Sequence, residues 1–297
     1  MKAMLKPVLG GAHFSFEPEN FPVLALRYFP PGTMGYVQDS PRSESEVLTM
    51  ATVSHSAAAR PAVHFTGRGG FLDKYFYFAM SLVVAGIVVW GFNHTVDQNL
   101  FHPAVPRPMI LWFHGAAFST WVLFFIFQST LVRTHNVKWH RFFGWFGLGL
   151  ATVMVPLGIT TSIVMGRFDI RTLHEKGVDA FLIVPWYDMV AFPVLISLAI
   201  LWRKKPEFHR RLIFIATCGL LDAAFGRIDY IFNHNLYFWC LDGVILLGVV
   251  RDLVVNRRIH KVYLVTLPVL IVCQMFVVHT YASASAWWMR IADGVLG

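Results

Sequence analysis

Seven apolar stretches of about 20 residues recur between residues 75 and 282, and they constrain the fold more than any other feature. A helix needs about 20 mostly apolar residues to cross the hydrocarbon core of a bilayer. With 56% hydrophobic and only 14% charged residues, the composition excludes an ordinary soluble domain. We therefore expect an all-α, multi-pass protein of the cell's inner membrane, with the lipid bilayer as a partner. The predicted membrane-spanning helices lie near residues 75–92, 109–131, 142–165, 181–202, 211–232, 236–254 and 262–282.

Basic residues concentrate in alternate links between these stretches. Three links hold twelve of them, whereas the links on the opposite side and the tail hold five. Because Lys and Arg near span ends stay in the cytoplasm, we predict an N-terminus inside and a C-terminus outside. The same distribution argues against a nucleic-acid partner despite the net charge of +8. The twelve residues are Arg133, Lys138, Arg141, Arg203, Lys204, Lys205, Arg210, Arg211, Arg251, Arg257, Arg258 and Lys261.

A short pattern repeats along the six spans that follow the first. Each predicted cytoplasmic link ends in a histidine followed by a basic residue, at His140, His209 and His260, and a new apolar stretch then begins. The offsets between the three histidines are 69 and 51 residues. We interpret this pattern as three helical hairpins repeated in parallel after the first helix.

The first part of the chain differs from the rest in composition. Residues 1–74 are rich in Pro, Gly, Ser and His, which predicts a largely disordered N-terminal arm. Met50 opens a polar segment suited to a short cytoplasmic arm, so residues 1–49 are a candidate upstream extension. The transmembrane bundle is expected over 75–282, followed by a short outer tail over 283–297.

Ionisable side chains inside the predicted spans gather in their outer halves. Each such group costs about 2.5 to 3.5 kcal/mol at bilayer depth, so these side chains must face one another, water or a ligand. We therefore predict an outward-facing polar cavity among the spans. At 1.5 Å of rise per residue, five of the groups lie roughly 5 to 10 Å from the predicted outer boundary, and Asp222 lies deeper. The five are His114, Asp188, Arg227, Asp242 and His279.

The stretch LDAAFGRIDYIFNH carries three charges that a helical wheel separates. On a continuous helix, Asp222 and Asp229 share a face about 10.5 Å apart, whereas Arg227 points about 140° away from Asp222. Arg227 is then badly placed to neutralise either aspartate of its own helix. We expect its partner on another span, with Asp188 and Asp242 as candidates.

These positions favour a transporter or sensor whose outer cavity binds a small polar or anionic ligand. The guanidinium of Arg227 offers a fork of donors suited to carboxylate or phosphate. In the span near 109–131, His114 and Gln128 share a face with Trp121 and Phe125. The candidate ligand-binding residues are Arg227, Asp188, Asp242, His114, Asp222 and Gln128.

The histidines allow a rival function, that of a membrane oxidoreductase with haem b or a divalent metal. The ligands would be His114 with His279, or the inner trio His140, His209 and His260. A simpler account of the trio is headgroup contact or helix capping at the cytoplasmic face. In a third alternative the protein is a non-catalytic membrane assembly subunit, and its buried charges only fix helix register.

A longer set of motifs carries a family resemblance. The segments HGAAFSTWVLFFIFQSTLVRTHNVKWHRFFG, VPWYDMVAFPVL, KPEFHRRLIFIATCGLLDAAFGRI and RIHKVYL resemble a family of uncharacterised bacterial multi-pass inner-membrane proteins. The resemblance covers about residues 109–265 and implies the multi-pass topology, without implying an activity. It rests on His114, Gln128, His140, Arg141, Asp188, His209, Arg227, Asp242 and His260.

Overall fold

A computed structural model describes residues 68–297, and this part of the chain is all-α, as the sequence predicts. The predicted arm up to residue 67, with its candidate extension 1–49, lies outside the described residues, whereas 68–74 already belong to the first helix. The elements are α1 (Arg68–Asn93), the π-helical turn η2 (Asp97–Phe101), α2 (Ile110–Arg133), α3 (Val137–Arg171), α4 (Val178–Phe181), α5 (Ile183–Leu201), α6 (Pro206–Gly219), α7 (Asp222–Phe225), α8 (Asp229–Asn233), α9 (Tyr237–Asn256), α10 (Lys261–Ala282) and α11 (Ala286–Leu296).

Five helical segments are long and apolar enough to cross a bilayer, which confirms a multi-pass membrane protein. Their outward faces leave large apolar side chains such as Leu123, Val153 and Val265 exposed, as lipid contact requires. The predicted sixth span, α9, is not among the five, and the predicted fifth span is split into short helices. The five segments are Gly70–Asn93, Ile110–Arg133, Val137–Arg171, Val178–Leu201 and Lys261–Ala282.

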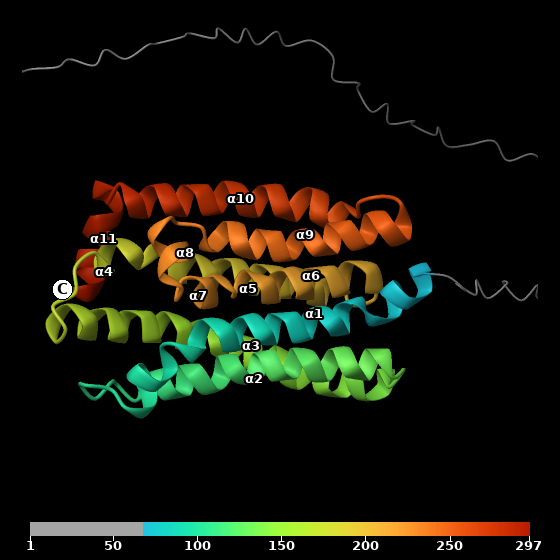
Figure 1. Cartoon of the computed structure of the whole chain (residues 1–297), viewed down its shortest axis with the longest axis horizontal. Helices are drawn as coiled ribbons and strands as arrows, with labels where there is room; N and C mark the ends of the chain where they lie inside the picture. The colour runs from blue at the N-terminus through green and yellow to red at the C-terminus, as the bar shows by residue number, and fades with distance from the viewer. Residues whose placement is uncertain (1–67) are drawn as a thin grey trace, which may run out of the picture. The chain divides into compact units, whose positions relative to one another are not determined.

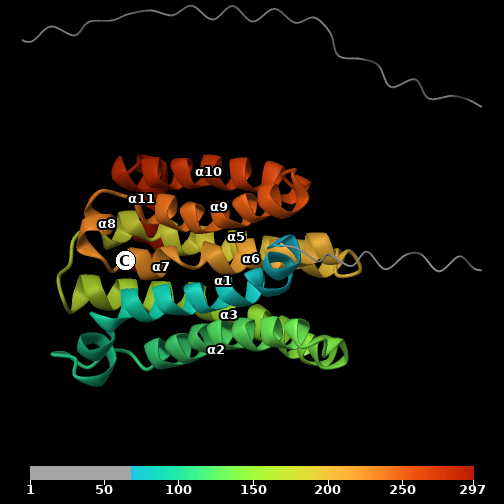
Figure 2. The same cartoon turned by 45° about the vertical axis from the view of Figure 1, so that its right-hand side comes forward.

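The long helices lie side by side in one bundle, with α2 on one side and α10 on the other (Figures 1 and 2). Consecutive helices pack as the pairs α2 and α3, α5 and α6, and α9 and α10. Links 134–136, 202–205 and 257–260 all lie at the end where α1 begins (Figure 1). We call this the basic end, because the three links and the helix turns beside them carry the twelve basic residues noted above.

The interior of the bundle is formed chiefly by α5, α6 and α9. Phe192, Phe214, Leu241 and Ile245 are almost completely buried there and belong to one continuous apolar cluster. The break between α6 and α7 lies beside this cluster, since Leu221 is also buried. Polar groups placed near the break are therefore held away from both lipid and water.

The predicted continuous helix over 211–232 is wrong, because the chain breaks twice within it. After Gly219 the amides of Leu220 and Leu221 bond carbonyls three residues earlier, which tightens and ends the helix. A second interruption follows α7, where Ile228 has extended backbone angles of φ −99° and ψ 110°. Discontinuous helices of this kind recur at the substrate and ion sites of membrane transporters.

Close backbone contact between α1 and α7 holds the broken segment in place. A Cβ atom added to Gly91 would collide with the backbone carbonyl of Ala224, so glycine is needed for this approach. By contrast, a Cβ on Gly86 of the same helix would meet no atom within 4 Å. The contact therefore depends on one position of α1 and not on the helix in general.

The tail predicted over 283–297 forms the short helix α11. The indole of Trp288 is buried and its Nε1 donates to the carbonyl oxygens of Asp179 (3.2 Å) and Ala180 (3.1 Å). Arg167 donates to the carbonyl of Val295. The tail is thus tied to α3 and α4.

Candidate functional site: an intramembrane carboxylate centre

Three aspartates that the sequence nominated lie in the bundle interior, on three different helices. Asp188 of α5, Asp222 of α7 and Asp242 of α9 are buried, with exposed fractions of 8%, 4% and 4%. We call these three residues, with Gln274 of α10, the carboxylate centre. A buried charge is strongly penalised unless it is paired, hydrogen-bonded or neutralised by a proton, so this grouping needs a physical explanation.

Asp188 and Asp222 form the closest part of the centre. Their carboxyl groups lie within hydrogen-bonding reach of each other. Asp222 is further held because its Oδ1 accepts the backbone N–H of Ala223 at 2.7 Å. Among residues 68–297, Oδ1 of Asp188 has no hydrogen-bond partner. One oxygen of this pair is therefore free to bond a proton, a water molecule or a ligand.

Asp242 is connected to a small cavity through Gln274. The side-chain amide of Gln274 donates through Nε2 to Oδ1 of Asp242 at 3.3 Å. A cavity of about 10 Å³ lies beside Asp188 and Gln274, and Tyr187 and Gly219 also line it. That volume is about the minimum for one water molecule. The interior is thus polar but nearly closed.

Arg227 does not occupy the position that the helical wheel predicted. Its guanidinium carbon lies 3.8 Å from the ring centroid of Phe92, and Nη1 donates to the carbonyl of Ala223. Within residues 68–297 no ion pair joins Arg227 to Asp188 or Asp242. The helix break removes the geometry on which the wheel relied, and Arg227 acts electrostatically on Asp222 of its own segment.

The two candidates on α2 lie at different depths. His114 is half-buried near Arg227 and stacks on Phe118, with 4.1 Å between ring centroids. Gln128 is buried, and neither of its amide atoms has a partner among residues 68–297. It lies five residues before the end of the helix at Arg133, or about 7.5 Å from that end. Trp121, Phe125 and Gln128 of the predicted shared face of α2 are all buried, so this face points into the bundle.

The structure separates His114 from His279 but places His140 near His209. His114 is on α2 and His279 on α10, helices on opposite sides of the bundle (Figures 1 and 2). The rings of His140 and His209 lie 6.2 Å apart, whereas the ring of His260 packs on Phe208 at 4.7 Å. Over residues 68–297, no group of three or more His, Cys, Asp or Glu side chains could hold a metal ion. A three-ligand metal group is therefore absent from the described residues, and a pair of histidines as ligands of haem b or a divalent metal stays a prediction.

Asp229 also departs from the pattern expected on a continuous helix. It begins α8 and is exposed, while Asp222 is buried at the start of α7. The two aspartates therefore do not share one face of a cavity. Only Asp222 of this pair belongs to the carboxylate centre.

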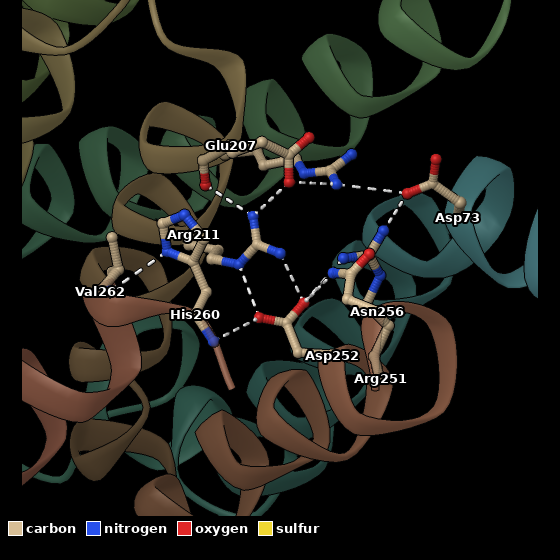
Figure 3. A network of polar contacts seen from close by, with 9 residues as sticks. Asp73, Glu207, Arg211, Arg251, Asp252, Asn256, His260 and Val262 are labelled. Carbon is tan, nitrogen blue, oxygen red and sulfur yellow. Dashed lines mark hydrogen bonds and ion pairs between the residues drawn. The ribbon is translucent and has the colours of Figure 1, made fainter. Parts of the chain in front are cut away.

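A second polar cluster, which the sequence did not reveal, lies at the basic end (Figure 3). Arg211 and Asp252 are both 0% exposed and form a two-pronged ion pair, with Nη2 to Oδ1 at 2.5 Å and Nε to Oδ2 at 2.9 Å. Asp252 also accepts from Arg251 Nη1 at 2.8 Å, from Asn256 Nδ2 at 3.2 Å and from the His260 backbone N–H at 3.3 Å. A buried ion pair needs this degree of hydrogen bonding to offset its desolvation.

The cluster continues to the surface and joins four segments of the chain. Glu207 accepts from Arg211 at 2.6 Å and from Arg210 at 2.7 Å, and Asp73 of α1 pairs with Arg210 and Arg251. We call Asp73, Glu207, Arg210, Arg211, Arg251, Asp252, Asn256 and His260 the basic-end network. It ties together the starts of α1, α6 and α10 and the end of α9.

Two groups of the network titrate differently from free side chains. Burial raises the pKa of Glu207, but the hydrogen bonds and positive charges of Arg211 and Arg210 outweigh it, and the pKa lies below the ordinary 4.5. Burial, with the nearby charge of Arg211, lowers the pKa of His260 from the ordinary 6.5. Its Nδ1 accepts the N–H of Val262 at 3.2 Å, so the neutral ring carries its proton on Nε2.

No protein-family model, curated protein or solved structure matches this chain. The family resemblance noted in the sequence therefore identifies no family. What the molecule does has to be inferred from the two polar clusters and from the bundle that contains them.

Proposed function

We propose that this multi-pass membrane protein is a transporter that binds a small polar solute at the carboxylate centre and moves protons together with it. The observation that carries the proposal is the break between α6 and α7, which sets the carboxyl group of Asp222 against that of Asp188. Two carboxyl groups in hydrogen-bonding reach are stabilised by one shared proton. Such a pair can release or take up that proton when a neighbouring ligand binds or the helices move.

The charge balance of the centre favours protons and cationic or neutral solutes over anions. Asp188, Asp222 and Asp242 supply three carboxyl groups, whereas Arg227 supplies one guanidinium, which already stacks on Phe92. An anion bound at that guanidinium would also lie near the carboxyl group of Asp222. The small polar ligand expected from the sequence is retained in this proposal, and binding of an anion becomes an outcome that the experiment can reveal.

The proposal includes a topology of seven crossings. The broken segment α6–α8 and the helix α9 supply the fifth and sixth, after the crossings of α1, α2, α3 and α4–α5. The basic end then faces the cytoplasm, with the N-terminus inside and the C-terminus outside. Asp188 lies ten residues from the start of the α4–α5 crossing at Val178, or about 15 Å from the opposite, outer end. The three helix pairs would supply the repeated hairpins.

A hydrophobic carbodiimide tests the shared proton directly. Dicyclohexylcarbodiimide partitions into membranes and forms a stable adduct with protonated carboxyl groups in an apolar interior, which it reaches when the helices move. We expect mass spectrometry of the treated protein to find the adduct on Asp188 or Asp222. Asp188→Asn and Asp222→Asn should each remove most of it, while Asp293→Asn, which alters an exposed carboxylate of α11, should not. Labelling confined to exposed carboxyl groups would contradict the proposal.

Thermal stability in detergent tests the ligand class. At equal ionic strength, we expect ethanolammonium chloride to raise the unfolding temperature more than sodium lactate does, and Asp188→Asn to abolish the difference. Stabilisation by lactate that is lost in Arg227→Met, with ethanolammonium inert, would instead establish an anion site at Arg227. Proteoliposomes with an entrapped pH dye then show whether the stabilising solute carries protons inward.

A further inference from the structure

A second, larger pocket opens at the basic end, away from the carboxylate centre. Its volume is about 390 Å³, within the range of small-molecule sites. The start of α6 forms one wall through Lys205 and Phe208, and the link between α9 and α10 forms the other through Asn256, Arg258 and His260. The transport proposal does not use this pocket.

Four of the seven residues that line the pocket, Lys205, Asn256, Arg258 and His260, bear a positive charge or a hydrogen-bond donor. Lys205 and Arg258 carry full charges, and Lys205 Nζ is held 5.7 Å from the ring centroid of Phe208. The one acidic side chain of the lining, Glu207, is already bound by two arginines of the basic-end network. The neutral ring of His260 adds an N–H donor at Nε2. An acidic group that enters the pocket therefore meets donors and no free carboxylate.

Helix direction adds to this preference. The helices α6 and α10 both begin beside the pocket, at Pro206 and Lys261. The N-terminus of a helix carries partial positive charge, which favours anions. Pro206, the first residue of α6, lines the pocket, and so does His260, which directly precedes α10.

We propose that this pocket binds a phosphate group. Lys205 and Arg258 supply the charge, and Nε2 of His260 and the amide of Asn256 supply neutral donors. Guanidinium and ammonium groups form short, charge-assisted hydrogen bonds with phosphate oxygens. The phosphate can belong to a phospholipid headgroup at the membrane surface or to a soluble phosphate, since both offer the same oxygens.

Occupation of the pocket would reach the basic-end network. Glu207, Asn256 and His260 line the pocket, and all three also bond Arg211 or Asp252 in the buried ion pair. A phosphate held there fixes the start of α6 relative to the end of α9. Binding should therefore stabilise the folded bundle as well as the pocket.

The experiment compares two double variants in the full-length protein. Lys205→Gln/Arg258→Gln removes the pocket charges, and Arg203→Gln/Lys204→Gln removes the same net charge from exposed neighbours outside the lining. All four side chains are exposed, so both variants should fold, which circular dichroism and gel filtration check. Native mass spectrometry after detergent extraction detects a retained phospholipid, and thermal unfolding of delipidated protein in inorganic phosphate against chloride detects a soluble phosphate.

We expect the wild type and the Arg203/Lys204 control to bind phosphate in at least one of these two measurements. The pocket variant should bind at least about tenfold more weakly, because two charge-assisted hydrogen bonds are lost. A retained phospholipid identifies a headgroup as the source, and stabilisation by inorganic phosphate alone identifies a soluble phosphate. Equal losses in the two double variants would overturn the proposal, since general surface charge would then explain binding. Failure of the wild type in both arms would overturn it as well.

Discussion

Removal of Asp252 should expose how strongly the basic-end network supports the fold. Asp252 is fully buried and accepts five hydrogen bonds, two of them from the equally buried Arg211. Asp252→Leu leaves that guanidinium with only the half-exposed Glu207 as a carboxylate partner, and loss of one partner from a buried pair costs about 3 to 5 kcal/mol. At 1.4 kcal/mol per factor of ten, the unfolding equilibrium should shift by about two to four orders of magnitude.

The buried thiol of Cys218 provides the assay. Cys218 is 0% exposed, so a thiol-reactive fluorescent dye should label it only when the bundle opens. In a background with Cys240→Ala and Cys273→Ala, the rate and midpoint temperature of labelling report unfolding in detergent. Asp252→Leu should label faster and at a lower temperature than the parent protein.

A double variant separates a lost ion pair from simple damage to packing. Arg211→Met/Asp252→Leu replaces both charges by apolar groups, a change that is often neutral or stabilising for a buried pair. It should recover most of the stability lost in Asp252→Leu alone. The reasoning would be refuted if Asp252→Leu matched the parent protein, or if the double variant were as unstable as the sum of the two single variants.

Three further predictions concern the close helix contact, the pH dependence and the topology. Gly91→Ala should destabilise the bundle by about 1 to 3 kcal/mol in the same dye assay, whereas Gly86→Ala, with open space around its Cβ, should be neutral or slightly stabilising. Because the folded pKa values of Glu207 and His260 lie below their ordinary 4.5 and 6.5, the folded state binds fewer protons, so stability should decline as pH falls below each ordinary value and through the folded pKa. In a plot of melting temperature against pH, Glu207→Gln should reduce the slope below about pH 4.5, and His260→Gln should reduce it below about pH 6.5. A reporter enzyme that is active only in the periplasm should be active when it is fused after Leu296. A fluorescent protein that matures only in the cytoplasm should stay dark when it is fused at the same position. The reverse pattern would contradict the outward C-terminus.

The sequence was sufficient for the general architecture and for the buried aspartates. Long apolar stretches determine membrane-spanning helices because hydrocarbon leaves a backbone few other choices. An aspartate in such a stretch has to face inward, so Asp188, Asp222 and Asp242 could be expected in the interior. Their mutual distances could not be expected, because these depend on how the helices are rotated against one another.

The break between α6 and α7 was beyond the sequence pattern. No proline marks it, and Gly219 and Gly226 are common enough in membrane helices to carry little weight. The interruption depends on tertiary packing, including the approach of Gly91 to the carbonyl of Ala224. A wheel drawn through the break gave Arg227 the wrong direction for this reason.

The basic-end network was missed because its arginines also satisfy the rule that places basic residues near cytoplasmic span ends. Arg211 and Arg251 were counted as surface charges of the links, yet both are buried. Two local signals were present. Glu207 precedes Arg211 by four residues on a helix, and Asp252 is an acidic residue within an apolar stretch beside Arg251.

The pairing of Arg211 with Asp252 has a consequence for the order in which the chain enters the membrane. Neither α6 nor α9 is among the segments apolar enough to cross by itself, and each carries one half of the ion pair. While ribosomes are still making α9, Arg211 of α6 has only the half-exposed Glu207 as a carboxylate partner and is held at the aqueous boundary. The two helices are therefore expected to partition into lipid together, after the earlier apolar segments have been integrated. Biogenesis of this protein would then end with the joint insertion of α6 and α9. If translation is stopped before residue 252, α6 should remain accessible to water-soluble labels.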